Sequence, residues 1–267
     1  GATVGWTPAS DIVSAFEPVA PPTQKALFGF GTTGSYTAVT NLVNSSGVVG
    51  SDVTGVGTAR HGLAAANFGG DKAIFGYGYS SAARVATTNL VSNEGVVASD
   101  TSGVGSVRYH LAAATFGGDK AIFGYGNTGS MVSITNLVSS SGVVATDTTG
   151  VGTARNGLGA AEFGVGKAIF AYGNGGSDVS MSNLVSNLGV VATDVSGVGT
   201  ARRFLAAASY GGDKAIFGYG IGGSSTATTN LVNSSGAVAA DVSGVGTARA
   251  ELAATSYGGD KAIFGYG

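Results

Sequence analysis

A repeat of about 47 residues is the feature that most constrains how this chain can fold. The phrase Lys-Ala-Ile-Phe-Gly-Tyr-Gly recurs, with small changes, at lysines 25, 72, 120, 167, 214 and 261. Repeats of this length are typical of propeller blades and of helical arrays. Each unit contains four short runs rich in Val, Ile, Phe, Tyr or Ala, separated by Gly, Asn, Ser and Asp. No run carries a helical apolar stripe longer than two turns, so the pattern favours strands.

A single unit shows how these strands are expected to arise. The unit at 108–146 predicts strands over residues 111–116, 120–125, 136–139 and 143–147. Gly117-Gly118-Asp119 separates the first two, where glycine supplies the positive φ of a tight turn. The small side chains of 112–114 suit an innermost strand, whereas Phe123 and Tyr125 can fill the space between neighbouring units.

These observations predict an all-β fold, a β-propeller of four-stranded antiparallel blades. The lysine phrase occurs six times, but a Ser/Thr-Asn-Leu-Val phrase occurs five times, with Asn at 41, 89, 136, 183 and 230. We therefore expect six blades with the last blade closed by both termini; five blades plus an extra strand is the alternative. Residues 25–267 form the repeats. Residues 1–24 hold all four prolines and the one Trp, and we expect this atypical segment to help complete the last blade.

The order of the phrases resembles the kelch repeat. An Arg opens each unit, a small apolar strand follows, and Gly-Gly-Asp-Lys leads into the aromatic and glycine-rich second strand. The resemblance covers 25–267 and implies a propeller. It departs from the kelch pattern in that Gly-Tyr-Gly replaces the double glycine and the blade Trp is missing. The near-identical sequences of the repeats are also similar, less specifically, to repeat proteins of tailed bacteriophages, especially marine ones.

Composition excludes several classes of function. The chain has no Cys, which removes disulfides, thiolate metal sites and cysteine catalysis. A net charge of −2 gives no electrostatic footprint for nucleic acid. No apolar run approaches the ~20 residues of a membrane helix, so membrane insertion is not expected. The chain begins with Gly and shows no signal peptide, which is compatible with a processed or excised piece.

Motifs for chemistry are equally scarce. The two histidines, His61 and His110, occupy different positions of the repeat and form no cluster with other metal ligands. The Gly-x-Gly runs lack a following Lys-Ser/Thr and a helix, and no repeated Ser-His-Asp set is present. We expect no enzyme, no metal and no cofactor.

Repeated charges are expected to be structural. An Asp precedes each repeat Arg by eight positions, giving the pairs Asp52/Arg60, Asp100/Arg108, Asp147/Arg155, Asp194/Arg202 and Asp241/Arg249. The planar guanidinium suits a bracket in which each Arg bonds the Asp or nearby carbonyls and fixes the connection between blades. The alternative is a ring of guanidinium groups that binds an anion near the axis.

Residues that differ between copies are the candidate binding residues. The two loops that vary, after the Arg and after the second strand, should lie on the same face of an up-and-down blade, as in a recognition surface on a rigid scaffold. Besides non-repeated residues such as Tyr36, Tyr79 and Asp178, we expect this loop-rich face to use His61, Arg84, Tyr109, His110, Asn156, Arg203, Phe204 and Glu251.

The sequence thus predicts a non-enzymatic binding or structural module. The phage-like resemblance implies a virion or extracellular protein that contacts a host receptor, another protein partner or a cell-surface glycan, with a place in a larger assembly. The alternative is a propeller lectin with similar sugar sites repeated between blades. The alternative explanation of the sequence differences between copies is that these loops simply tolerate substitutions and have no binding role.

Overall fold

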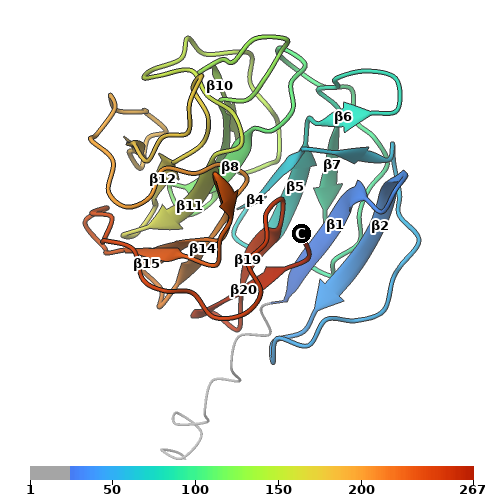
Figure 1. Ribbon diagram of the computed structural model, residues 1–267. Helices are drawn as coiled ribbons and strands as arrows, with labels where there is room; N and C mark the ends of the chain where they lie inside the picture. The colour runs from blue at the N-terminus through green and yellow to red at the C-terminus, as the bar shows by residue number, and fades with distance from the viewer. Residues whose placement is uncertain (1–24) are drawn as a thin grey trace, which may run out of the picture.

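The computed structural model describes residues 25–267, and this region is all-β, with strands and no helix. The expectation that residues 1–24 complete the last sheet lies outside the described residues. Repeated small antiparallel sheets follow one another along the chain (Figure 1).

The regular unit is a sheet of three antiparallel strands. Its middle strand is the Lys-Ala-Ile-Phe phrase, with the small-residue strand on one side and the Asn-Leu-Val strand on the other. The four such sheets are β4 (Ala64–Phe68), β5 (Lys72–Gly76) and β7 (Thr88–Val91); β8 (Ala112–Phe116), β9 (Lys120–Gly124) and β10 (Thr135–Val138); β11 (Gly159–Phe163), β12 (Lys167–Ala171) and β13 (Ser182–Val185); and β14 (Ala206–Tyr210), β15 (Lys214–Gly218) and β18 (Thr229–Val232). Gly117 and Gly118 take φ of 63° and 81° in the turn between the first two strands, as the sequence predicts.

The first and last sheets have two strands each within the described region. The first holds β1 (Ala26–Thr32) and β2 (Tyr36–Val43), which correspond to a middle strand and its Asn-Leu-Val neighbour. The last holds β19 (Ala253–Tyr257) and β20 (Lys261–Gly265), a small-residue strand and a middle strand. Two minor pairs, β3 (Arg60–His61) with β6 (Tyr79–Ser80) and β16 (Ile221–Gly222) with β17 (Ser224–Ser225), extend the loops.

The expected fourth strand is not formed, and the sheets have two or three strands. Residues 143–148 are joined to β10 by the isolated bridges Val138 to Val144 and Thr135 to Thr148 and by single hydrogen bonds, without a continuous ladder. The bridged residues of β10, Thr135 and Val138, are three positions apart, whereas their partners Val144 and Thr148 are four positions apart. The facing segment thus has one extra residue, which interrupts the ladder as a β-bulge does. The Asn136 side chain bonds the Ala145 carbonyl at 3.0 Å within this break. The fourth segment is therefore attached to the sheet without being a strand of it.

The core lies between successive sheets. In the central sheets the aromatic side chains of the middle strand are fully buried, as at Phe123 and Phe170. The Tyr that follows one middle strand meets the Phe of the next edge-on, as in Tyr77–Phe123 at 5.1 Å and Tyr125–Phe170 at 5.2 Å. Such pairs add about 0.5–1.5 kcal/mol beyond the burial of their area. The sequence prediction that these rings fill the space between units is confirmed by this packing.

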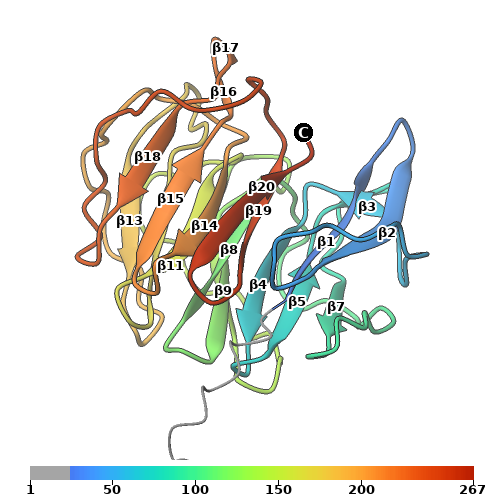
Figure 2. The ribbon, with the colours of Figure 1, turned by 90° about the horizontal axis from the view of Figure 1, so that it is seen from below.

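The last sheet also contacts the first. Strand β19 packs on β1, and Tyr266 meets Phe28 edge-on with ring centroids 5.2 Å apart (Figures 1 and 2). A Cβ on Gly265 would lie 3.0 Å from the Phe28 ring, as one on Gly76 would lie 2.6 Å from Phe123. Sheets at opposite ends of the chain are therefore packed in the same way as consecutive ones.

Candidate functional site

The repeat arginines hold each sheet together from inside. Arg155 is fully buried and donates from Nε to the Tyr172 carbonyl at 2.9 Å, from Nη1 to the Thr153 carbonyl at 3.1 Å and from Nη2 to Asn183 Oδ1 at 2.7 Å. Arg60 and Arg108 make the same three bonds. Tyr172 directly follows the second strand of the unit and Asn183 lies in the third, so the guanidinium fork ties these two strands to the segment that contains Thr153.

The carboxylate beside each Arg is not the one eight residues before it. Asp194 accepts from the Thr153 amide and hydroxyl and from Asn183 Nδ2 at 2.9 Å, and its Oδ1 is 3.8 Å from Arg155 Nη1. The structure therefore groups Asp100 with Arg60, Asp147 with Arg108, Asp194 with Arg155 and Asp241 with the Thr200–Arg202 segment. The reason is topological, since the Arg opens a sheet, the Asp closes the same sheet, and the Asp eight residues before belongs to the preceding one. Asp52 bonds Asn41 in the first sheet.

The same arginines also join neighbouring sheets. Each guanidinium lies over an aromatic ring of the preceding unit, for example Arg155 over Tyr125 at 4.3 Å and Arg249 over Tyr219 at 4.4 Å. Burial raises the pKa of Tyr125 to about 12 and lowers the pKa of Arg155. The donors of Arg155 are directed at protein acceptors and its face is covered by a ring. Arg155 is therefore part of the repeated structural core of the sheets, which we call the frame.

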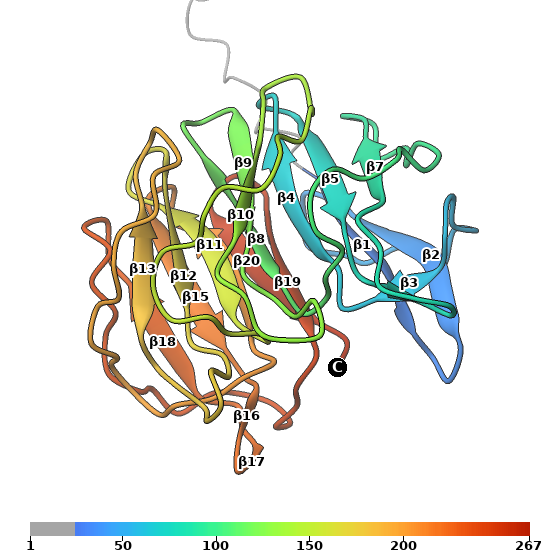
Figure 3. The same cartoon turned by 90° about the horizontal axis from the view of Figure 1, so that it is seen from above.

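Both variable loops lie at one end of this frame. The residue after each Arg pairs with the residue after each second strand: His61 with Tyr79, Tyr109 with Asn127, Asn156 with Asn174 and Arg203 with Ile221. Strands β3, β16 and β17 lie at this end, on the side where the C-terminus is found (Figure 3). The strand order predicts this arrangement, which gathers side chains from different repeats.

The next position in each unit has a left-handed backbone. Gly62, His110, Gly157, Phe204 and Glu251 all have φ between 52° and 61°. Amide-to-carbonyl bonds run from one to the next, for example from His110 to Gly62 at 2.7 Å and from Phe204 to Gly157 at 2.7 Å. Glycine takes this conformation freely, whereas another residue costs about 1–2 kcal/mol. The backbone conformation thus favours Gly at this position, and His110, Phe204 and Glu251 adopt it at a cost in conformational free energy.

Aromatic and cationic side chains from four repeats meet at this end, in a cluster that we call the aromatic patch. Its members are Tyr36, His61, Tyr79, Arg84, Tyr109, His110 and Phe204. Tyr36 stacks on His61 at 5.0 Å, and His61 lies 5.9 Å from His110. Tyr109 lies 5.5 Å from Tyr79 and 4.4 Å from His110, which in turn lies 4.8 Å from Phe204. The rings form one contiguous set.

The patch contains one guanidinium group, Arg84, and a second, Arg203, lies at its border; only Arg203 is paired with a carboxylate. Arg203 forms an ion pair with Asp178 at 2.7 Å and lies over Phe204 at 5.6 Å. Arg84 lies over Tyr109 at 5.6 Å, and its Nε is buried with no hydrogen-bond partner. Within residues 25–267 Arg84 has no carboxylate partner. It is the cation of the patch that an anionic ligand group can neutralise.

The remaining expected binding residues lie at the same end but outside the patch. Asn156 pairs with Asn174, and Glu251 is exposed at the last left-handed position. The sequence marks Tyr36 and Tyr79 only as non-repeated. Tyr79 joins the patch because it pairs with His61, and Tyr36 joins it by stacking on His61 from the preceding unit. The proximity of His61 and His110 was not predicted either. It arises because adjacent positions of neighbouring units face each other.

The histidines are brought together without forming a metal site. Burial, with a smaller contribution from His61, lowers the pKa of His110 to about 4. Among residues 25–267 no group of three or more His, Asp or Glu side chains is placed to hold a metal ion.

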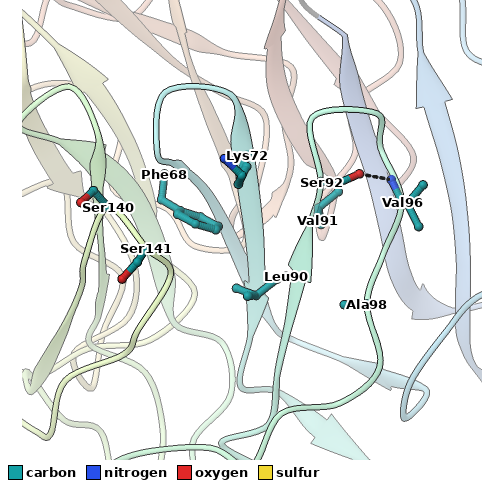
Figure 4. Close-up of a pocket in the computed structure, with 9 residues that line it drawn as sticks. All are labelled: Phe68, Lys72, Leu90, Val91, Ser92, Val96, Ala98, Ser140 and Ser141. Carbon is teal, nitrogen blue, oxygen red and sulfur yellow. Dashed lines mark hydrogen bonds between the residues drawn. The ribbon is translucent and has the colours of Figure 1, made fainter.

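A groove at the opposite end has a different character. Phe68, Leu90 and Val96 line a cavity of about 450 Å³ beside the Ser140-Ser141 turn of the next unit (Figure 4). The same contact recurs in other copies, where a Cβ on Gly189 would meet Phe116 and Leu137 just as one on Gly142 would meet Phe68 and Leu90. The contact that borders this groove is therefore a product of the repeat.

No protein-family model matches this chain, and no curated protein is significantly similar to it. In the part of the chain that the structure describes, no helix is long and apolar enough to cross a membrane.

Proposed function

We propose that this chain is a non-enzymatic binding module, a six-bladed propeller that recognises a partner through the aromatic patch. The ring is supported by one contact repeated six times. A Tyr or Phe of each unit meets the Phe of the next, at Phe30–Phe75, Tyr77–Phe123, Tyr125–Phe170, Tyr172–Phe217, Tyr219–Phe264 and Tyr266–Phe28. The last pair returns to the first sheet, which favours six blades over five plus an extra strand.

The observation that carries the binding proposal is the gathering of non-repeated side chains at one end of a repeated frame. At the left-handed position two copies keep Gly, whereas His110 and Phe204 place rings there despite the strained backbone. Strained residues persist where the surrounding structure holds them, and they concentrate at functional sites. Aromatic and Arg side chains are also those that dominate binding energy at interfaces.

The partner that suits this surface is a protein or a cell-surface glycan that brings an anionic group to Arg84. Tyr79 and Tyr109 offer half-buried rings beside that cation, so a flat apolar face and a negative charge on the partner would be recognised together. A virion or extracellular setting fits such a partner and rests on the bacteriophage resemblance alone.

A lectin with repeated sugar sites is the second candidate, and the groove of Figure 4 is the observation that favours it. The groove combines apolar side chains with Ser hydroxyls, and the contact between neighbouring units beside it recurs in other copies. The rings of Phe123 and Tyr125 are fully buried and do not contribute to it. Sugar binding here would be multivalent and would leave the aromatic patch uninvolved.

Loop exchange within the chain tests the proposal. Tyr109→Asn with His110→Gly installs in the third unit the residues found naturally at 156 and 157. The fluorescently labelled chain is screened against a glycan array and a displayed peptide library, and the hits are titrated. The exchange should weaken binding at least about tenfold, because it removes two rings of the patch.

The matched control lies at the opposite end. Val165→Gly restores the Gly found at 70, 118 and 212, and this side chain is 89% exposed. It should leave binding unchanged. A hit that resists the loop exchange but is lost on changing Phe68 or Leu90 would replace the patch with the lectin groove, and the absence of any saturable hit in either screen would contradict both candidates.

A further inference from the structure

Two glycines beside the rings of the aromatic patch have a role that the repeat does not require of them. We infer that Gly62 and Gly157 are positioning residues for binding. Because they carry no side chain, the rings of His110 and Phe204 lie over them, and the patch becomes one continuous surface. Their role rests on the function proposed for the patch, and it identifies two residues that a partner need not touch.

The left-handed position does not itself demand glycine. Gly62, His110, Gly157, Phe204 and Glu251 follow one another there, and each of the last four donates its amide to the carbonyl of the one before, at 2.7–2.9 Å. The backbone is therefore nearly the same whether the residue is Gly, aromatic or acidic. Both units that carry a ring at this position follow a unit with Gly, whereas Glu251 follows Phe204 and is exposed.

A side chain at either glycine would come too close to the ring of the following unit. A Cβ on Gly62 would lie 2.8 Å from His110 Cδ2, and one on Gly157 would lie 3.0 Å from both Cδ1 and Cε1 of Phe204. Carbon atoms in favourable contact are about 3.5–4.0 Å apart. The two rings thus lie back over the preceding unit, in the space that each glycine leaves free.

Gly157 has the larger consequence, because its unit lies between the units of His110 and Phe204. Across this unit the two rings meet edge-on, with centroids 4.8 Å apart. His110 also contacts Tyr109 and His61, so it links Phe204 to the remaining rings. A side chain at position 157 would separate Phe204 from those rings and divide the patch in two. A partner that covers the whole patch therefore depends on Gly157.

NMR on a matched pair of variants separates this positioning role from backbone strain. Asn adopts the left-handed conformation more readily than most residues, so Gly157→Asn mainly tests the space beside the ring. Gly212→Asn is the control, because Gly212 has φ of 79° and a Cβ there would have no atom within 4 Å. Nuclear Overhauser effects between the rings of His110 and Phe204 should persist in Gly212→Asn and disappear in Gly157→Asn. The core pair Tyr125–Phe170 reports in each variant that the fold is kept.

A double-mutant cycle measures the consequence for binding, with the strongest hit from the glycan and peptide screens as the probe. Gly157→Asn should weaken binding as much as Phe204→Gly does, at least about tenfold. In the Phe204→Gly background it should weaken binding no further, because the ring that it displaces is gone. Gly212→Asn should leave binding unchanged, and Gly62→Asn with His110→Gly should form the same cycle.

Two results would overturn the inference. One is a His110–Phe204 Overhauser effect that persists in Gly157→Asn. The other is a loss of affinity from Gly157→Asn that is equal with and without the Phe204 ring. The absence of any saturable hit contradicts the proposed function and with it the binding role of the glycines, whereas the NMR comparison alone decides whether they position the rings.

Discussion

Replacing Arg155 with Ala should destabilise the protein more than any change at the loop end. The side chain is fully buried and donates three hydrogen bonds, to two carbonyls and to Asn183 Oδ1. Its removal leaves these acceptors without a donor, takes the cation from beside Asp194 and uncovers the Tyr125 ring.

The magnitude follows from those losses. Hydrogen bonds to a charged group contribute about 1.5–3 kcal/mol each but are not additive within one network. Breaking a buried charge network by removing one member typically costs about 3–5 kcal/mol. We therefore expect the free energy of unfolding to fall by about 3–5 kcal/mol, and the melting temperature to fall by roughly 10 °C for a chain of this size.

Guanidinium denaturation followed by circular dichroism measures this loss. Arg203→Ala is the matched control, because Arg203 is 34% exposed and its ion pair with Asp178 lies near the surface. Pairs of that kind contribute about 0–1 kcal/mol. If Arg155→Ala costs no more than Arg203→Ala, the repeat arginines do not hold the sheets together and our reasoning about the frame is wrong.

Three further predictions concern the backbone, the packing and pH. The pKa of His110 is about 4 in the folded chain against an ordinary 6.5, so the unfolded state binds more protons than the folded state between these pH values. The free energy of unfolding should therefore fall as the pH is lowered from 6.5 to 4. In melting experiments at several pH values, His110→Gly should flatten that fall. Gly124→Val should cost about 1–3 kcal/mol in denaturation, because its Cβ would lie 2.7 Å from the Phe170 ring, while Gly124→Ala, matching the natural Ala171, should be milder. Val165→Gly should raise the melting temperature, since Val165 has φ of 28° where the other turns have Gly; an unchanged or lower value would mean that this backbone is unstrained.

The repeat made most of the local structure predictable. Alternating apolar runs and Gly-Gly-Asp turns located the strands to within one or two residues, as at 120–125 against the observed Lys120–Gly124. The fourth strand was wrong because period-two patterning does not reveal a bulge. The extra residue before Thr148, and the Asn136 side chain that fills the break, are visible only once the two segments face each other.

The site was predictable in its location and not in its contacts. Variable positions such as Tyr109 and Arg203 could be assigned to one face from strand order. Spacing along the chain could not show that His61 meets His110, since that contact joins different units. Likewise, a constant spacing of eight suggested Asp147 for Arg155, whereas the topology places Asp194 beside it.

The central claim is that six sheets close into one ring, and the contact between Phe28 and Tyr266 tests it most directly. With selectively protonated Phe and Tyr rings, nuclear Overhauser effects report ring protons within about 5 Å of each other. Tyr125–Phe170 and the other consecutive pairs, with centroids about 5 Å apart, serve as internal standards. A closed ring predicts a Phe28–Tyr266 signal of comparable strength, matching the 5.2 Å centroid separation. Signals from the consecutive pairs without one between Phe28 and Tyr266 would show an open array and contradict the claim.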